Sequence, residues 1–212
     1  MRNLHDLIIR DQYDSGGRCD ETKGNLIKEL IIETNAQLCV EIGVFKGASL
    51  MYFAEALEIT KGKVIGIDPY SMGSLINEIP DKKLNKYIYE VLFKDQVILD
   101  NLYRGVLKVI TENKLENIIS LVRIKSEEYH TNIEKESIDV LHIDGNHDEE
   151  YVTKDIQFYL PLVKKGGYII MDDTTWPGVI NSIKDHLNSG TILIKSTCSD
   201  TPKNKQGAYG SI

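Results

Sequence analysis

Short apolar segments alternate with longer segments of helical periodicity along most of this chain, and this alternation constrains the fold more than any other feature. The apolar segments with strand-like composition are 37–43, 63–68, 120–126, 138–144 and 166–173. The segments with helical spacing are 24–35, 47–58, 148–164 and 84–113, the last as one long helix or two consecutive helices. Near-continuous apolar strands that alternate with helices pair in parallel through right-handed crossovers. The sequence therefore predicts an α/β fold with a mostly parallel sheet and helices on both faces.

The C-terminal part of the chain predicts a different pairing. Segments 191–199 and 206–212 flank SDTPKNK, whose Pro and Asn favour a turn, so we expect an antiparallel hairpin that closes the sheet. The chain has 212 residues without an internal repeat or a linker, which predicts a single domain over 1–212. The polar residues 1–23 and the aperiodic residues 69–83 are candidate lid segments over the mouth of a site.

Composition excludes some classes of partner. The formal net charge is -7, from 25 Lys and Arg against 32 Asp and Glu, and no dense basic stripe is present, so nucleic acid is not an expected partner. No apolar stretch approaches the roughly 18 residues that cross a bilayer, which predicts no membrane span. The chain has three widely spaced cysteines, an odd number that suits a reducing compartment, and we expect a cytoplasmic protein.

A glycine-rich turn and an acid follow the first two predicted strands. In an open α/β sheet, ligands bind at the carboxyl ends of the strands. Gly43 and Gly47 flank the turn in VEIGVFKGAS, which is neither a GxGxxG motif nor a phosphate loop. Asp68 closes the next strand, 25 residues after Gly43, where an acid can accept hydrogen bonds from both hydroxyls of a ribose. S-adenosylmethionine and NAD both contain that ribose, and a helix or turn cap is the alternative role for Asp68.

Three further acids follow the predicted strands 138–144 and 166–173. Asp144 lies in LHIDGNHDEEY, and Asp172 and Asp173 lie in MDDTTW. Neighbouring parallel strands would bring the three carboxylates together, where they would repel one another unless a cation lay between them. Oxygen ligands suit Mg²⁺, Mn²⁺ or Ca²⁺, so these acids are candidate metal ligands. Capping of the following helices is the alternative role.

His147 stands three residues after Asp144 and is a candidate general base. An unperturbed imidazole has a pKa of about 6.5, so at neutral pH most of it is free to accept a proton. A surface histidine at the start of a helix is the alternative. His142 points to the other side of the same strand, and we expect it to be packed in the sheet.

The segment EIGVFKGASL, residues 41–50, resembles the cofactor loop of class I S-adenosylmethionine-dependent methyltransferases, especially the caffeoyl-CoA and catechol O-methyltransferase branch. The resemblance implies that Gly43 and Gly47 pass under the methionine part of the cofactor and that Glu41 supports the loop or the cofactor's amino group. It also implies that Ser126 contacts the adenine, although a helix-capping serine is equally consistent with the sequence. Asp144 falls on a position of that branch beside both the cofactor and the metal.

HIDGNH followed by MDDT is similar to the metal-dependent sugar O-methyltransferases of macrolide biosynthesis and to cephalosporin hydroxylase-like proteins, which are grouped as methyltransferase family 24. The catechol enzymes have a lysine at the position of His147, so this histidine departs from their pattern. In the sugar enzymes it is the expected base. Asp144, Asp172 and Asp173 fall on the metal-ligand positions of these families. The D/N-P-P-Y signature of amino-group methyltransferases is missing after 138–144, which favours oxygen as the acceptor atom.

The sequence thus predicts an S-adenosylmethionine-dependent and Mg²⁺-dependent O-methyltransferase, with a single-domain Rossmann-like fold, that acts on a hydroxyl of a small molecule or sugar. The predicted catalytic residues are His147 and Asp144. The apolar helical stretch after Lys83 is suited to a subunit interface of a homo-oligomer. Three alternatives remain: an NAD-dependent Rossmann oxidoreductase, a non-catalytic, cephalosporin hydroxylase-like partner protein that binds the same cofactor, and a non-catalytic interaction domain that kept the fold.

Overall fold

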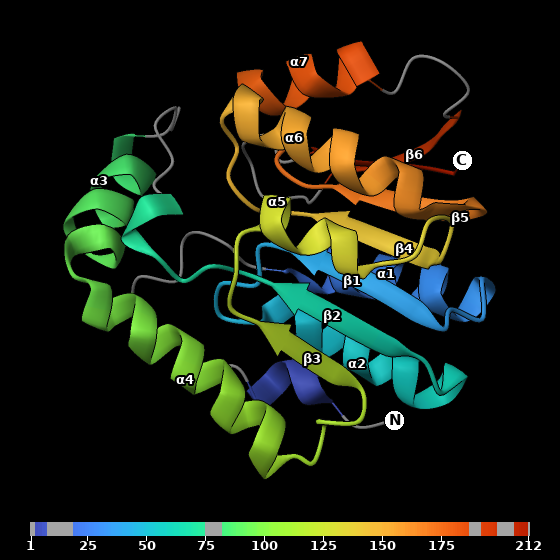
Figure 1. The fold of residues 1–212 in the computed structure, drawn as a ribbon, viewed down its shortest axis with the longest axis horizontal. Coiled ribbons are helices and arrows are strands. Elements are labelled where there is room, and N and C mark those ends of the chain that lie inside the picture. The colour runs from blue at the N-terminus through green and yellow to red at the C-terminus, as the bar shows by residue number, and fades with distance from the viewer. Residues whose placement is uncertain (1–2, 8–18, 75–81, 187–191, 199–205, 212) are drawn as a thin grey trace.

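The computed structural model describes residues 3–7, 19–74, 82–186, 192–198 and 206–211. In this part of the chain seven strands form one sheet in the order β3-β2-β1-β4-β5-β7-β6 (Figure 1). The strands are β1 (Leu38–Ile42), β2 (Lys63–Ile67), β3 (Ile119–Val122), β4 (Ile138–Ile143), β5 (Val163–Met171), β6 (Ile192–Cys198) and β7 (Gln206–Ser211). The first five pair in parallel, and β7 pairs antiparallel with both β5 and β6. The predicted α/β fold with a mostly parallel sheet is confirmed.

Helices connect the parallel strands. The α-helices are α1 (Glu21–Glu33), α2 (Ala48–Thr60), α3 (Lys82–Glu90), α4 (Gln96–Glu112), α5 (Ser126–Tyr129), α6 (Glu149–Tyr159) and α7 (Pro177–His186). Short 3₁₀ turns are η1 (Leu4–Leu7), η2 (Met72–Ser74), η3 (Leu92–Lys94), η4 (His130–Asn132) and η5 (Leu160–Leu162). None of the helices in the described residues is long and apolar enough to cross a membrane.

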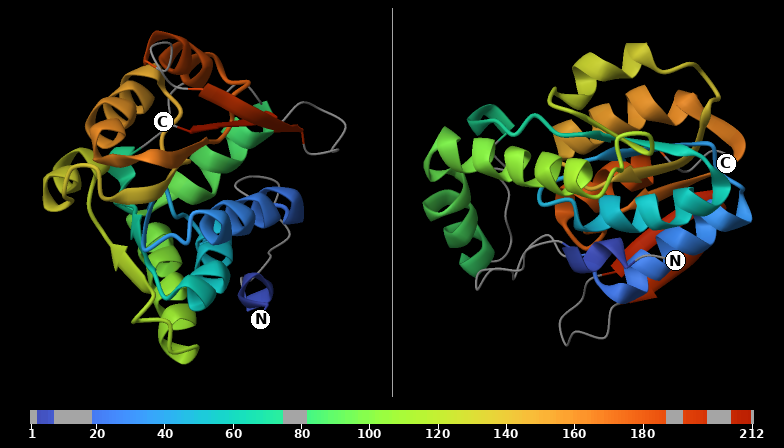
Figure 2. Two further views of the ribbon diagram at one scale, coloured as in Figure 1. Left: turned by 90° about the vertical axis from the view of Figure 1, so that its right-hand side faces the viewer. Right: turned by 90° about the horizontal axis from the view of Figure 1, so that it is seen from below.

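The helices cover the two faces of the sheet, as the alternation of segments predicts. Side chains alternate along each strand, so Cys39 and Val140 pack with α1, α2 and α4, while Val40 and Leu141 pack with α6 and α7. Figure 2 shows these two groups of helices on opposite sides of the sheet. Each fully buried aliphatic side chain contributes about 1.5–3 kcal/mol to folding. The two layers therefore fix the strand ends firmly relative to one another.

The structure decides between the two forms predicted for one helical segment and shortens another segment. The segment 84–113 contains two helices, because the chain turns extended at Asp95, whose carboxylate accepts a hydrogen bond from the Val97 amide and starts α4. The segment 148–164 is helical only to Tyr159; Pro161 lies in the following 3₁₀ turn, and β5 begins at Val163. The predicted lid segments 1–23 and 69–83 lie in part outside the described residues.

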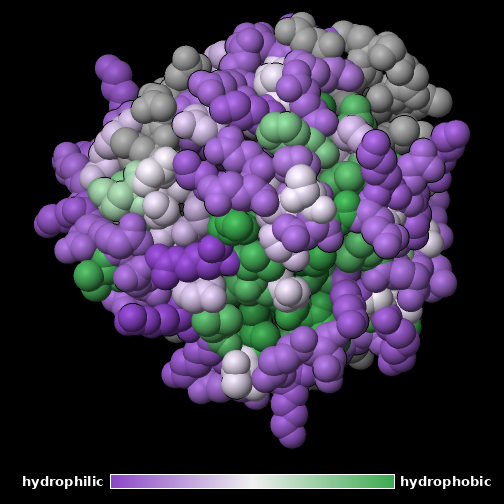
Figure 3. Space-filling model, in the orientation of Figure 1, coloured by the Kyte–Doolittle hydropathy of each residue, from purple (hydrophilic) through white to green (hydrophobic). Residues whose placement is uncertain are grey.

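One face of the sheet has an apolar surface near its edge. In the view of Figure 1, no described helix crosses the front of β2 and β3. Figure 3 shows apolar side chains gathered over this area, between α4 and α5, with polar side chains around them. The cavity described below lies at the carboxyl ends of the strands.

Candidate functional site

A single cavity lies at the carboxyl ends of β1, β2, β4 and β5. Its lining includes Gly43 after β1, Asp68 after β2, Asp144 and His147 after β4, and Asp173 after β5. Ser126 and Asp172 also line it. Most residues that the sequence singles out for binding or catalysis are thus brought to one cavity.

Gly43 makes the closest backbone contact of the site. It has φ +85, and a Cβ atom there would lie 2.1 Å from the carbonyl oxygen of Asp144. Only glycine therefore lets the end of β1 pass so close to the end of β4. Gly47, at φ 81, is the N-cap residue of α2 and is not among the residues that line the cavity.

Asp68 links the end of β2 to the turn flanked by Gly43 and Gly47, here called the glycine loop. Its Oδ2 accepts hydrogen bonds from the amides of Val44 at 3.1 Å and Phe45 at 2.9 Å, and its Oδ1 accepts one from Tyr70 at 2.8 Å. Burial raises the pKa of Asp68, and these three amides oppose the rise. The carboxylate is thus held at the cavity wall, and its oxygens keep lone pairs for a ligand.

Asp144 occupies the centre of the charged part of the cavity, and its two oxygens face different neighbours. Oδ2 accepts a hydrogen bond at 2.9 Å from the ammonium group of Lys23 in α1, and the same group contacts Asp172 Oδ2 at 2.5 Å. Burial raises the pKa of Asp144, but Lys23, His147 and His142 more than offset this and hold it well below its usual range. Asp144 is therefore ionised at neutral pH.

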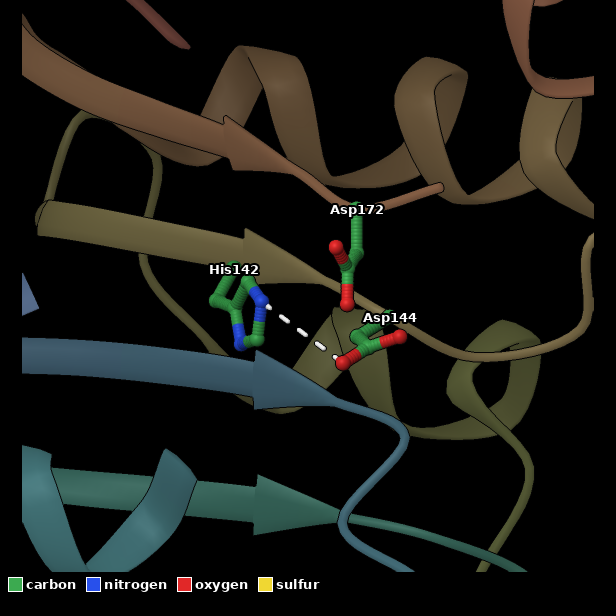
Figure 4. Close-up of side chains that lie close together, drawn as sticks. All are labelled: His142, Asp144 and Asp172. Carbon is green, nitrogen blue, oxygen red and sulfur yellow. Dashed lines mark ion pairs between the residues drawn. The ribbon is translucent and has the colours of Figure 1, made fainter. Parts of the chain in front are cut away.

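Glu41 and His142 form a buried pair beneath Asp144. Both side chains have 0% exposure, and His142 Nδ1 lies 2.9 Å from Glu41 Oε1. His142 Nε2 lies 3.9 Å from Asp144 Oδ2 (Figure 4). His142 is packed in the sheet as predicted. Glu41, predicted to support the loop or the cofactor's amino group, faces His142 and is not among the cavity-lining residues.

His147 lies on the other side of Asp144. Its Nε2 is 3.7 Å from Asp144 Oδ1 and 3.3 Å from Asp173 Oδ2, and its ring packs against Trp176 with centroids 4.7 Å apart. Burial lowers the pKa of His147, but the carboxylates of Asp144, Asp173 and Asp172 outweigh this effect and raise it. His147 is therefore not an exposed histidine at a helix start; it is held among carboxylates at the cavity wall.

The three acids do not converge on one point as predicted. Donor atoms within 4.8 Å of one another form two groups among the described residues, one of His142, Asp144 and Asp172, the other of Asp144, His147 and Asp173. Consecutive residues of an extended chain point to opposite sides, and Asp173 also has φ +45. Asp172 therefore turns toward Lys23, and Asp173 turns toward His147. No donor group within the described residues contains all three carboxylates, and the three-acid metal site stays a prediction.

A buried carboxyl group lies at the end of the cavity near α5. Asp155 of α6 accepts a hydrogen bond from the Ser126 hydroxyl at 2.5 Å, and both residues line the cavity. Ser126 is the first residue of α5 and follows the N-cap Lys125, so it does not cap this helix. Burial raises the pKa of Asp155 to about 7. Asp155 is thus largely protonated in mildly acidic solution.

Asp155 should make the stability of the protein depend on pH. Its pKa is raised in the folded state above 3.8, so its contribution to stability is fully present below pH 3.8 and is lost as the pH rises through about 7. Relative to Asp155→Asn, the wild-type free energy of unfolding should fall by up to about 4 kcal/mol between about pH 4 and about pH 8. Urea unfolding of both proteins across this range measures the difference. Parallel pH profiles would show that Asp155 titrates normally.

Lys23 and Asp155 were not predicted as site residues, although each has a signal in the sequence. Lys23 precedes the buried Ile27 and Leu30 by four and seven positions, on the apolar side of α1. Asp155 stands in the buried stripe of α6 between Val152 and Tyr159. A charged residue within the apolar stripe of a helix is unusual, because it must find a buried partner.

Comparison with known proteins finds similarity to methyltransferases. A family model described as a methyltransferase domain matches residues 40–174. A putative caffeoyl-CoA O-methyltransferase from Staphylococcus aureus is 17% identical, with 92% of this chain and 85% of that chain covered and a TM-score of 0.64. An O-methyltransferase from Bacillus cereus in complex with SAH is 15% identical, with 93% and 84% covered and a TM-score of 0.62. At these identities the likeness concerns the fold alone.

A curated relative is the uncharacterized protein R132 of Acanthamoeba polyphaga mimivirus, which is 28% identical over 134 residues. The match covers 63% of this chain and 50% of that protein, so the chain spans about half the length of the relative. The likeness to these solved structures shows a Rossmann-like methyltransferase fold, with the cavity at the strand ends. The chain belongs to the methyltransferase domain family whose model spans β1 to the end of β5, as its resemblance to methyltransferase family 24 predicts.

Proposed function

We propose that this protein is an S-adenosylmethionine-dependent O-methyltransferase. The observation that carries the proposal is that the glycine loop, Asp68 and the imidazole of His147 all line one cavity. A donor site and a proton acceptor within one cavity are the minimum that methyl transfer to a hydroxyl needs. The methyltransferase domain that matches residues 40–174 favours this function over the NAD-dependent oxidoreductase.

The residues that would hold the donor lie along one wall. S-adenosylmethionine supplies an electrophilic methyl group on its sulfonium. Gly43 leaves room for the close approach of a ligand to the loop, and Asp68 presents acceptor oxygens suited to the ribose hydroxyls. Ser126 lines the far end of the cavity, where an adenine would lie. The carboxylate of Asp144 would face the positive charges of the donor.

His147 is the proposed general base. Its ring nitrogens are buried and accept or donate no hydrogen bond within the described residues, while Asp173 and Asp144 lie 3.3 and 3.7 Å from Nε2. The carboxylates raise the proton affinity of the imidazole, so His147 would take the proton of a hydroxyl as the new C–O bond forms and would be stabilised as an imidazolium. Trp176 limits the positions that the ring can adopt.

The proposal includes a divalent ion, held by two of the three predicted ligands. The residues that would hold a divalent ion are Asp144 and Asp173, which each have an oxygen within 4.8 Å of the other and of a ring nitrogen of His147. A bound divalent ion acidifies a coordinated hydroxyl. Asp172 is not part of this set, because its carboxylate contacts Lys23.

The acceptor is proposed to be a hydroxyl of a small molecule or sugar. The cavity wall combines carboxylates that accept hydrogen bonds from hydroxyls with the apolar ring of Trp176, a combination that suits a sugar ring. A non-catalytic partner protein that binds the cofactor remains the second candidate, and only turnover with an acceptor separates the two.

Calorimetry tests the donor site directly. The wild type should bind S-adenosylhomocysteine and should not bind NAD. Loss of one ribose hydroxyl, in a deoxy analogue, should weaken binding to the wild type by roughly 10- to 150-fold, because a charged hydrogen bond is worth about 1.5–3 kcal/mol. The same loss should cost Asp68→Asn much less. Equal losses in the two proteins would show that Asp68 supports only the loop.

A further inference from the structure

The ammonium group of Lys23 occupies the space between two carboxylates of the site. Its Nζ lies 2.9 Å from Asp144 Oδ2 and 2.5 Å from Asp172 Oδ2. The three side chains are largely shielded, with exposures of 16%, 19% and 21%. Ion pairs at this depth are weakly screened, so the lysine neutralises much of the local negative charge.

The local structure of α1 holds Lys23 in this position. The helix begins at the N-cap Asp20, whose carboxylate accepts a hydrogen bond of 2.8 Å from the Lys23 amide. The backbone of Lys23 is therefore fixed in the first turn, and only the side chain has freedom to move. Burial lowers the pKa of Lys23, but Asp144 and Asp172 outweigh it and raise the pKa well above its ordinary value.

His142 provides a third possible cation ligand, next to the carboxylates of Asp144 and Asp172. His142 is fully buried, its Nδ1 is held by Glu41, and its Nε2 has no hydrogen-bond partner within the described residues. That nitrogen faces Asp144 Oδ2 at 3.9 Å (Figure 4). Histidines that ligate metals are commonly held in this way, by a carboxylate on the other ring nitrogen. Together His142, Asp144 and Asp172 form a nitrogen-and-oxygen donor set with donor atoms within 4.8 Å of one another, and the lysine ammonium contacts its two carboxylates.

We propose that Lys23 is the resident cation of a His142, Asp144 and Asp172 site, and that this site binds a divalent ion only when the lysine ammonium is withdrawn. The lysine thereby directs any divalent ion to the opposite side of Asp144, next to Asp173. The inference rests on the proposed function, because Asp144 contacts Lys23 and also lines the cavity in which methyl transfer is proposed. It explains why the two consecutive acids face different partners.

The affinity for Mn²⁺, measured by electron paramagnetic resonance of the free ion, tests the proposal. Lys23→Met should bind Mn²⁺ roughly tenfold or more tightly than the wild type, because a buried positive charge next to the carboxylates is lost. Lys23→Arg, which keeps the charge, should not gain affinity. Lys28→Met is a matched control on the same helix, because Lys28 pairs with Glu55 at 3.2 Å, outside this cluster, and its loss should leave Mn²⁺ affinity unchanged.

Two double variants locate the gained site. Lys23→Met with Asp172→Asn should lose the gain, while Lys23→Met with Asp173→Asn should keep most of it. The proposal is overturned if Lys23→Met binds Mn²⁺ no more tightly than the wild type, or if the gain depends on Asp173 rather than Asp172. Thermal unfolding confirms that each variant is folded, and Lys23→Gln, which also removes the charge and should show the same gain, replaces Lys23→Met if that variant is unstable.

Binding of S-adenosylhomocysteine to the wild type separates this proposal from the proposed function. If the wild type fails to bind the cofactor, the methyltransferase function fails, whatever the Mn²⁺ affinities are. If it binds the cofactor and Lys23→Met gains no Mn²⁺ affinity, only the role of Lys23 fails.

Discussion

His147→Gln should lower kcat for methyl transfer by roughly 10²- to 10⁴-fold, the usual contribution of a general base. Glutamine is similar in size and polar, but it cannot accept a proton at neutral pH. His147 lies at the cavity wall 3.3 Å from Asp173, and it is not part of the glycine loop or the Asp68 region. The affinity for S-adenosylmethionine should therefore remain close to that of the wild type.

A second histidine provides the control for this experiment. His130 stacks on Phe158 with ring centroids 4.4 Å apart and is not among the cavity-lining residues, so His130→Gln should keep the wild-type kcat. Single-turnover measurements at saturating cofactor give the rate of the chemical step in both variants. A His147→Gln enzyme that methylates at the wild-type rate would show that the imidazole is not the base.

Gly43→Ala should destabilise the fold by about 2 to 5 kcal/mol, since an alanine in the left-handed region and a clash with fixed backbone each cost a few kcal/mol. The added Cβ would lie 2.1 Å from the Asp144 carbonyl oxygen and 2.6 Å from the Gly145 Cα. Both partners are backbone atoms at the end of β4, so no side chain can move away to make room. The distortion would fall on Asp144, and cofactor binding should weaken with stability.

Gly105→Ala is the matched control for this substitution. Gly105 lies inside α4, and an added Cβ would meet no atom within 4 Å. Alanine is favoured over glycine in a helix by about 1 kcal/mol, so this variant should be at least as stable as the wild type. Urea unfolding of the two variants under the same conditions gives both values. Equal stability of Gly43→Ala and Gly105→Ala would contradict the close approach of β1 and β4.

The fold was predictable from local patterns because the central strands β1 and β4 are almost entirely buried on both faces. Val40 and Cys39 are both fully buried, one on each face, and such a strand belongs in the interior of an α/β sheet. The break between α3 and α4 was not fixed by periodicity, since apolar spacing continues across it. It depends on the extended backbone of Asp95, one residue whose capping role competes with helix continuation.

The sequence predicted which strand ends form the site, but not every side-chain contact within it. Asp68, Asp144 and Asp173 reach one cavity because parallel strands end at the same edge of the sheet. The division of Asp172 from Asp173 was not predictable, because it depends on Lys23, which approaches from a helix about 120 positions earlier in the chain than Asp144. Glu41 was assigned to the cofactor by resemblance, whereas the alternation of side chains along β1 turns it toward His142.

The central claim is that a donor methyl group and an acceptor hydroxyl meet in the cavity beside His147. Incubation of the protein with methyl-labelled S-adenosylmethionine and a panel of hydroxylated acceptors, sugars among them, tests it most directly. We expect the label on an oxygen of at least one acceptor and no transfer by His147→Gln on the same time scale. A protein that binds no S-adenosylmethionine, or that transfers the label only to nitrogen, would contradict the claim.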